Sequence, residues 1–154
     1  MTNRRAQIEM APGELAAFLR EQRELTCATA GRDGWPHLMP LWFVIRDGEC
    51  WSWTYAKSQK VRNLERDARC TLQLETGHEY HELRGAMIKA ECVLHRDLDT
   101  VALLGAEIAE RYGGAQLDDA AREAIRGQAA KRVGLQFRVR EVATWDHRKL
   151  AGGY

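Results

Sequence analysis

No apolar run in this 154-residue sequence approaches the roughly 20 residues that a membrane-spanning helix needs. The start of the chain also lacks the pattern of a secretory signal, because Met1–Arg5 is followed by Ala6–Glu9, which is not an apolar segment. We therefore expect a cytoplasmic protein with no membrane partner.

The sequence also lacks an excess of charge of either sign. It has 23 Lys and Arg residues against 22 Asp and Glu residues, a formal net charge of +1. A balanced chain has no global attraction to nucleic acid or to an anionic membrane. Any anion that it binds must be held by a local cluster of basic groups, so the expected partner is a small molecule.

Cysteine is scarce, and no Cys-x-x-Cys pair occurs among the four cysteines. Scattered cysteines in a reducing compartment are usually buried thiols. His78 and His81 lie close together but have no third ligand nearby in the sequence, so we expect no metal site. No residue pattern identifies a catalytic acid or base.

Hydrophobic periodicity predicts one domain, residues 1–154, with strands alternating with a few helices. The strands are expected at Leu25–Ala30, Trp35–Ile45, Cys50–Tyr55, Arg69–Glu75, Tyr80–His95 and Val133–Val142. The helices are expected to begin at Pro12, to span Lys60–Arg66, to run from Asp97 to Gly113-Gly114, and to lie near Asp118–Arg126. Tight turns between consecutive strands imply an antiparallel sheet, and about six such strands usually close into a barrel or sandwich.

Two features refine the strands. Pro36 and Pro40 cannot donate to a ladder, so part of their strand should be an edge or a bulge. Gly85 marks a possible bulge or bend in the long strand. Within Cys50–Tyr55, alternation places Trp51 and Trp53 on one face and Cys50, Ser52 and Thr54 on the other.

Basic and hydroxyl side chains gather between a strand end and a helix start. These residues are Lys57, Ser58, Lys60 and Arg62. A helix N-terminus offers unpaired N–H groups and the positive end of a dipole, which together favour a phosphate. The alternative is a solvated basic turn, which the charge pattern alone favours because such turns are common.

The segment Tyr55–Arg69 resembles the signature of the pyridoxamine 5'-phosphate oxidase-like superfamily. Within that superfamily the chain is most similar to the flavin/deazaflavin-dependent oxidoreductases. Supporting pieces are Gly34–Pro36, Pro40–Phe43 and Glu82–Gly85, and the resemblance covers roughly Leu15 to Val142.

The resemblance implies a six-stranded antiparallel split β-barrel of the FMN-binding type, mainly β with flanking helices. It also implies a homodimer with the cofactor in a groove between subunits. The expected function is that of an oxidoreductase, which uses coenzyme F420 or FMN to transfer hydride to a small unsaturated or quinone-like substrate. The alternative is a non-catalytic protein of the same fold that binds or stores a flavin, a deazaflavin or haem.

The resemblance also assigns the phosphate contacts. Lys60 falls at the position of the phosphate-binding lysine, with Ser58 as a neighbouring contact and Lys57 beside it. Gln59, also expected at the cofactor, stands where the pyridoxamine phosphate oxidases proper carry arginine. Their Arg-Leu-His-Asp-Arg ending is absent, so pyridoxamine phosphate is not the expected substrate.

The cofactor ring is expected along Met39–Phe43, which places Pro40, Leu41 and Trp42 against it, with Trp53 and Thr54 on the returning strand. Trp145 resembles a tryptophan that borders the site near the family's C-terminus, and the tail that follows is expected to close the groove. The alternative is that these tryptophans fill the core or pin the tail. A groove for a polyanionic cofactor tail, which would favour F420, is one interpretation of a basic set, and simple exposure to solvent is the other: Lys57, Arg62, Arg148 and Lys149.

Overall fold

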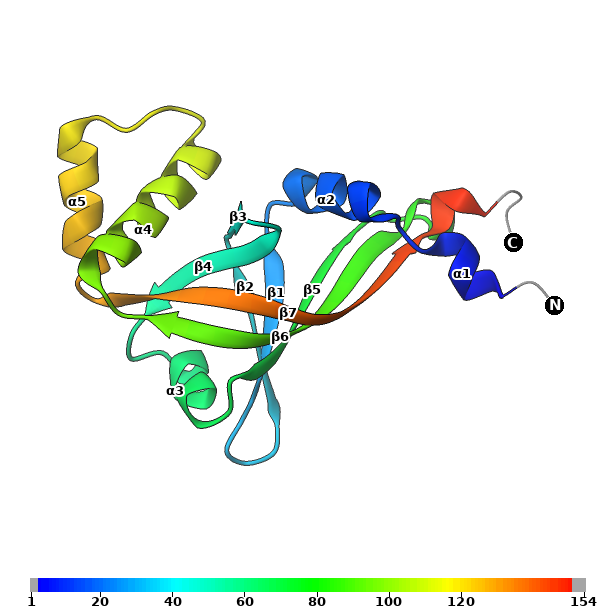
Figure 1. Cartoon of the computed structure of the whole chain (residues 1–154), viewed down its shortest axis with the longest axis horizontal. Coiled ribbons are helices and arrows are strands. Elements are labelled where there is room, and N and C mark those ends of the chain that lie inside the picture. Colours follow the sequence, from blue (N-terminus) through cyan, green and yellow to red (C-terminus); the bar gives the residue numbers. More distant parts are fainter. Residues whose placement is uncertain (1–2, 151–154) are drawn as a thin grey trace.

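The computed structural model describes residues 3–150, and this part of the chain folds around one antiparallel sheet of seven strands. The order across the sheet is β2-β1-β5-β6-β7-β4-β3. The sheet curls into a half-barrel with helices at its rims (Figure 1). The mainly β fold with flanking helices, of the split-barrel type, is therefore confirmed.

The strands are β1 (Leu25–Ala30), β2 (Pro36–Leu41), β3 (Val44–Arg46), β4 (Glu49–Tyr55), β5 (Arg69–Thr76), β6 (Arg84–His95) and β7 (Arg132–Asp146). The prediction of six strands was one short, because the strand expected at Trp35–Ile45 divides at Trp42 and Phe43. The Ser52 hydroxyl donates to the Trp42 carbonyl at 2.6 Å. The Tyr112 hydroxyl accepts from the Phe43 N–H and donates to its carbonyl, both at 3.0 Å, so the backbone of this pair bonds to side chains instead of a ladder.

This division closes the half-barrel. β2 pairs with β1 at one edge of the sheet, as its prolines predicted, and β3 pairs with β4 at the other edge. Leu41 and Val44 are three residues apart, so their Cα atoms lie within about 11 Å of each other. The two edges must therefore approach each other.

The helices are α1 (Arg4–Ile8), α2 (Pro12–Glu21), α3 (Gln59–Arg66), α4 (Leu98–Gly113), α5 (Asp119–Ala129) and the 3-10 turns η1 (Tyr80–Glu82) and η2 (His147–Lys149). As predicted, Asp97 caps α4 by accepting the Thr100 N–H at 2.8 Å, and α4 ends at Gly114 with φ of 72°. The prediction that Tyr80 begins a strand was wrong. The Glu82 carboxylate accepts the Glu79 N–H at 3.4 Å and folds this segment into η1.

The two faces of β4 are confirmed as predicted. Cys50, Ser52 and Thr54 are buried inside the half-barrel, where the main core also contains side chains such as Phe18, Leu72 and Phe137. Trp51 and Trp53 point to the other face and pack under α4. A Cβ at Gly105 of α4 would lie 2.3 Å from the Trp53 ring, so only glycine permits this close approach.

Gly85 has a different role from the predicted bulge. The register shift in β6 lies between Lys89 and Ala90 instead. Gly85 pairs with Trp145 of β7, and a Cβ at position 85 would lie 2.1 Å from the indole. Gly85 therefore makes room for the Trp145 ring.

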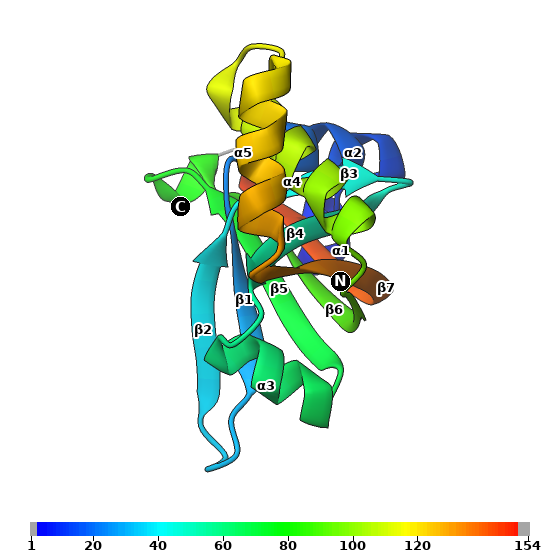
Figure 2. The ribbon, with the colours of Figure 1, turned by 90° about the vertical axis from the view of Figure 1, so that its left-hand side faces the viewer.

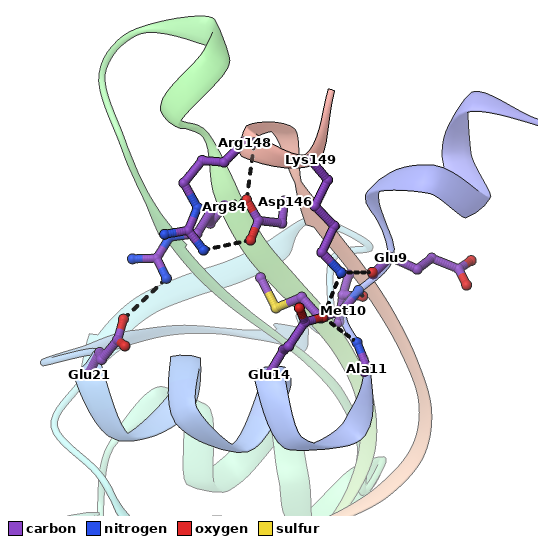
Figure 3. Close-up of polar contacts among 10 residues, drawn as sticks. Glu9, Met10, Ala11, Glu14, Glu21, Arg84, Asp146, Arg148 and Lys149 are labelled. Carbon is purple, nitrogen blue, oxygen red and sulfur yellow. Dashed lines mark hydrogen bonds and ion pairs between the residues drawn. The ribbon is translucent and has the colours of Figure 1, made fainter. Parts of the chain in front are cut away.

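Ion pairs join the two ends of the described chain (Figure 3). The Lys149 ammonium donates to the Glu9 carbonyl at 2.7 Å and to the Glu14 carboxylate at 2.5 Å. Asp146 is buried and accepts from the Arg148 guanidinium at 2.9 and 2.7 Å. The Arg148 hydrogen bond holds the pKa of Asp146 below its usual 3.8. We call this group of contacts the terminal clamp.

Replacing Asp146 by asparagine should lower the free energy of unfolding at pH 7 by about 1–2 kcal/mol, because a buried carboxylate loses a charge-assisted contact to a half-exposed arginine. The folded-state pKa is depressed, so this stabilisation is present above pH 3.8 and disappears as the pH falls through the lower, folded-state pKa. Urea unfolding at several pH values measures the difference.

Glu141→Gln is the matched control, since Glu141 also lies on β7 but pairs with Lys89 at the surface. It should change the stability by less than about 0.5 kcal/mol. Equal losses in the two variants would show that Asp146 contributes no more than a surface pair.

Candidate functional site

A cleft of about 900 Å³ lies between α3 and the β1–β2 hairpin. Figure 2 shows α3 beside this hairpin, whose turn projects past the helix. The cleft is lined by Gly31, Arg32, Asp33, Trp35, Pro36, His37, Gln59, Arg62, Asn63, Glu65 and Arg66. Basic side chains from two elements that are distant in sequence thus share one cavity with the exposed Trp35.

Asn63 attaches α3 to the sheet. It is fully buried, and its amide donates to the Thr29 hydroxyl of β1 at 3.1 Å. Its carbonyl oxygen accepts from Gln59 at 2.9 Å and from Arg66 at 3.3 Å. Arg66 also donates to the Ala30 carbonyl at 2.6 Å. Asn63 and Arg66 together therefore hold the helix against the hairpin beside the cleft.

The cleft lining carries three arginines, Arg32, Arg62 and Arg66, against two acidic residues, Asp33 and Glu65. Glu65 is paired with Arg96 at 2.5 Å, outside the lining set. The side chains of Arg32 and Arg62 have no hydrogen bond or ion pair to any of residues 3–150. Two free guanidinium groups in one cavity favour an anionic ligand.

Lys60 lies inside the fold and not on the cleft surface. It is 7% exposed, and its ammonium donates to the Thr54 hydroxyl at 3.1 Å. No carboxylate among the described residues pairs with it. Burial lowers the pKa of Lys60 below its ordinary value of 10.5. One neutral hydrogen-bond partner does not offset the cost of burying a positive charge, and a bound anion would offset it.

Ser58 is the N-cap of α3, yet its side chain makes no capping hydrogen bond. Its hydroxyl is one of three buried side-chain polar atoms that have no hydrogen-bond partner within residues 3–150. The others are the His37 Nδ1 atom, in the cleft lining, and the Arg132 Nε atom. The Arg132 guanidinium lies 4.4 Å over the Trp53 ring and 4.3 Å over the Tyr55 ring, so it belongs to the Trp53 face of β4 and not to the cleft.

These unpartnered atoms identify where a ligand fits. Unpaired buried polar groups are costly and rare in native proteins, so the Ser58 hydroxyl at the start of α3 and the His37 Nδ1 atom in the cleft lining point to a missing partner. The donors present, an ammonium, a hydroxyl, guanidinium groups and free helix N–H groups, suit a phosphate. Sequence reasoning missed His37 and Arg32, because both are close to α3 only through tertiary pairing.

The other predicted site residues lie elsewhere. Lys57 is exposed on the turn before α3, and of the predicted residues only Gln59 and Arg62 line the cleft. Pro40, Leu41 and Trp42 stand at the end of β2 away from the cleft, and Leu41 is buried in the core. The ring of Trp53 packs under α4, as the core-packing alternative predicts.

Trp145 is far from α3 within one chain. Arg69, three residues after α3, pairs through Glu91 with Arg138 of β7. Trp145 lies seven residues further along β7, which is roughly 23 Å of extended strand. Figure 1 shows the C-terminal turn and α3 well separated along the molecule. Instead of crossing the cleft of its own chain, the tail joins the terminal clamp.

The cysteines are free and buried, as predicted. Burial raises the pKa of Cys50 to about 12 and raises that of Cys92 too. Their thiolates are therefore scarce at neutral pH, which argues against nucleophilic roles. No group of three or more potential metal ligands occurs within residues 3–150. In the same range, no helix is long and apolar enough to cross a membrane.

Comparison with known families bears directly on this helix and cleft. The family model for pyridoxamine 5'-phosphate oxidase matches residues 11–146, which is most of the chain. The chain belongs to the pyridoxamine 5'-phosphate oxidase family. The matched range includes the whole sheet and α3, so the predicted resemblance is confirmed at the family level.

Solved structures extend the comparison of this pyridoxamine 5'-phosphate oxidase family member. The conserved hypothetical protein Rv2991 from Mycobacterium tuberculosis is 37% identical with a TM-score of 0.88, over 97% of this chain and 96% of that one. An F420 reductase is 18% identical with a TM-score of 0.61, over 82% and 93% of the two chains.

HutZ, the haem storage protein of Vibrio cholerae, is 17% identical with a TM-score of 0.66, over 87% of this chain and 94% of that one. At such identity, the likeness to the reductase and to HutZ shows the fold alone. The search of curated proteins found no match.

The cost of burying the Lys60 ammonium can be tested without any ligand. Lys60→Met should leave the free energy of unfolding unchanged or raise it by about 1 kcal/mol, because an isosteric apolar side chain carries no desolvation cost. The lowered pKa means that the folded chain binds fewer protons than the unfolded chain at pH values between the folded-state pKa of Lys60 and 10.5. Wild-type stability should therefore rise toward that of the variant as the pH approaches 10.5.

Urea unfolding of both proteins at pH 7 and pH 10 measures this effect, with the exposed Lys131→Met as the control for a methionine replacement. If the free energy of unfolding fell by more than about 1 kcal/mol in Lys60→Met and not in Lys131→Met, the Lys60 ammonium would itself stabilise the folded chain.

Proposed function

We propose that this protein binds a phosphorylated flavin-type cofactor, coenzyme F420 or FMN, and transfers hydride to a small unsaturated or quinone-like substrate. One observation carries the proposal: the first turn of α3 and its N-cap supply both a buried ammonium, Lys60, and an unpartnered buried hydroxyl, Ser58. Family membership supports it, since the matching family model is that of pyridoxamine 5'-phosphate oxidase, an oxidase whose substrate carries a phosphate. An F420 reductase shares the fold.

In this proposal the chain contributes binding, orientation and exclusion of water. Lys60, Ser58 and the first N–H groups of α3 hold the phosphate. Arg32 and Arg62 neutralise further anionic groups in the cleft, which favours the polyanionic F420 over FMN. The bound cofactor supplies the hydride chemistry itself, which explains why no acid–base pair stands out in the sequence.

We also propose a homodimer with the cofactor groove at the subunit interface. Four apolar side chains on the strands are at least 38% exposed: Leu38, Met39, Val139 and Val142. The distance between Trp145 and α3 in one chain adds a second argument. A groove lined by both Trp145 and α3 must take the tryptophan from one copy and the helix from the other, as in a symmetric dimer.

Static light scattering at low micromolar concentration tests the dimer. The expected mass is twice the 17.6 kDa of one chain. Leu38→Lys should shift the mass toward that of a monomer, because a charge in an apolar interface is costly to desolvate. A monomeric wild type across the micromolar range would exclude this assembly.

The alternative is a non-catalytic protein that binds or stores a flavin, a deazaflavin or haem. The fold shared with HutZ favours it, since one fold serves both roles. The absorbance spectrum of the purified protein identifies any retained chromophore. Turnover of reduced cofactor with a panel of quinones and enones then separates the enzyme from the carrier.

The phosphate contact has its own test. Lys60→Met should weaken binding of F420 and FMN about tenfold or more, because one charge-assisted hydrogen bond to phosphate contributes roughly 1.5–3 kcal/mol. Binding of the phosphate-free riboflavin and deazaflavin analogues should change far less. Calorimetric titration of all four ligands gives both ratios. Equal affinity of the two proteins for F420 and FMN would place the phosphate away from Lys60.

A further inference from the structure

The connection between β2 and β3 holds an exposed aromatic ring in one fixed position. Trp42 is 56% exposed, yet its indole stacks on the Tyr112 ring of α4 with centroids 4.4 Å apart and planes within 7°. The chain covers Trp51 and Trp53 with α4 but leaves Trp42 open. The open side of this indole is therefore a flat aromatic surface that the stack holds in place.

Several contacts hold the indole in place. The Trp42 carbonyl accepts from Ser52, and the Tyr112 hydroxyl is bonded to both backbone groups of Phe43. The Arg111 guanidinium also donates to the Phe43 carbonyl and lies 4.5 Å over the Phe43 ring. Its other donations, to the Arg20 carbonyl at 3.1 Å and the Gln22 carbonyl at 2.8 Å, join this cluster to the end of α2.

The charges behind the stack select what can lie on its open face. The Arg23 guanidinium lies 4.7 Å over the Tyr112 ring, and Arg111 lies 5.4 Å from the same ring. Because the Trp42 indole covers one face of Tyr112, Arg23 must lie against the other. Two nearby positive charges disfavour a cationic ligand on the indole. A neutral or anionic planar ring meets no such penalty.

Position along the sheet connects this stack to the cleft. β2 borders the cleft at Pro36 and His37 and leads directly to Trp42, a span of roughly 20 Å. A cofactor held at α3 by its phosphate and lying along β2 would present its ring toward Trp42. A planar substrate stacked on the indole would then lie next to that ring.

We propose that the open face of Trp42, supported by Tyr112, is the stacking platform for the hydride-accepting substrate, a neutral or anionic planar ring of the quinone type. The inference rests on the proposed function and adds the substrate's binding surface to it. Because the indole is already held in place, a ligand that stacks on it does not have to order the Trp42 side chain. The stacking energy is therefore not reduced by that entropy cost.

Indole NMR of the cofactor-free protein tests this platform. Protein labelled with ¹⁵N in its tryptophans is titrated with menadione, a neutral naphthoquinone, and Trp42→Phe assigns the Trp42 Nε1–H signal. The Trp42 signal should shift saturably while that of Trp35, in the cleft, stays unchanged. The planar cation N-methylquinolinium should bind more weakly than menadione. The buried thiols keep menadione from reacting with cysteine.

Tyr112→Leu keeps the indole but removes its support, and should weaken menadione binding about fivefold, the size expected of one immobilised aromatic stack. The unchanged signals of Trp51 and Trp53 verify the fold. An unmoved Trp42 signal, a shift at Trp35 in its place, or a Trp42 signal that responds only to protein concentration would overturn the platform. FMN or F420 binding that still depends on Lys60 would then leave the proposed function standing.

Discussion

Trp42 and Phe43 join two strands that lie at opposite edges of one sheet, and this short connection decides how the sheet can curve. With so few residues between β2 and β3, the edges must come together, and the sheet closes into a half-barrel. The strand hydrogen bonds lost at this point are replaced by side chains, Ser52 from inside the half-barrel and Tyr112 from α4. The interior core and the outer helix pair therefore depend on one corner.

The charged groups of this protein fall into two kinds. In the terminal clamp, Asp146 meets Arg148 and Glu14 meets Lys149, so charge is matched within the chain. At α3 the opposite holds, because the buried Lys60 has no acidic partner within residues 3–150. Matched charges stabilise a fold, whereas unmatched buried ones lower its stability until a ligand arrives. This contrast distinguishes a structural ion-pair cluster from a binding site.

The sheet also separates the two ends of the proposed site. The phosphate-binding groups belong to the hairpin end near α3, and Trp145 belongs to the end near the clamp, where Gly85 makes room for its ring. β2 links the first of these regions to the Trp42 corner. In this proposal, a cofactor that extends along β2 reaches from the cleft to the Trp42 corner along a single edge strand. A contact from Trp145 to that cofactor has to come from a second copy of the chain.

Local chemistry in the sequence was enough to predict most elements. Alternation placed Ser52 and Thr54 inside and Trp53 outside, Asp97 and Gly114 marked the ends of α4, and the family signature directed attention to Lys60. What the sequence could not supply was non-local. Periodicity shows which face a side chain takes, but not which element covers that face. The stack of Trp42 on Tyr112, 70 residues away in the chain, and the meeting of Arg32 with Arg62 in one cleft arise only when the sheet closes, because only then do distant backbone segments come within side-chain reach.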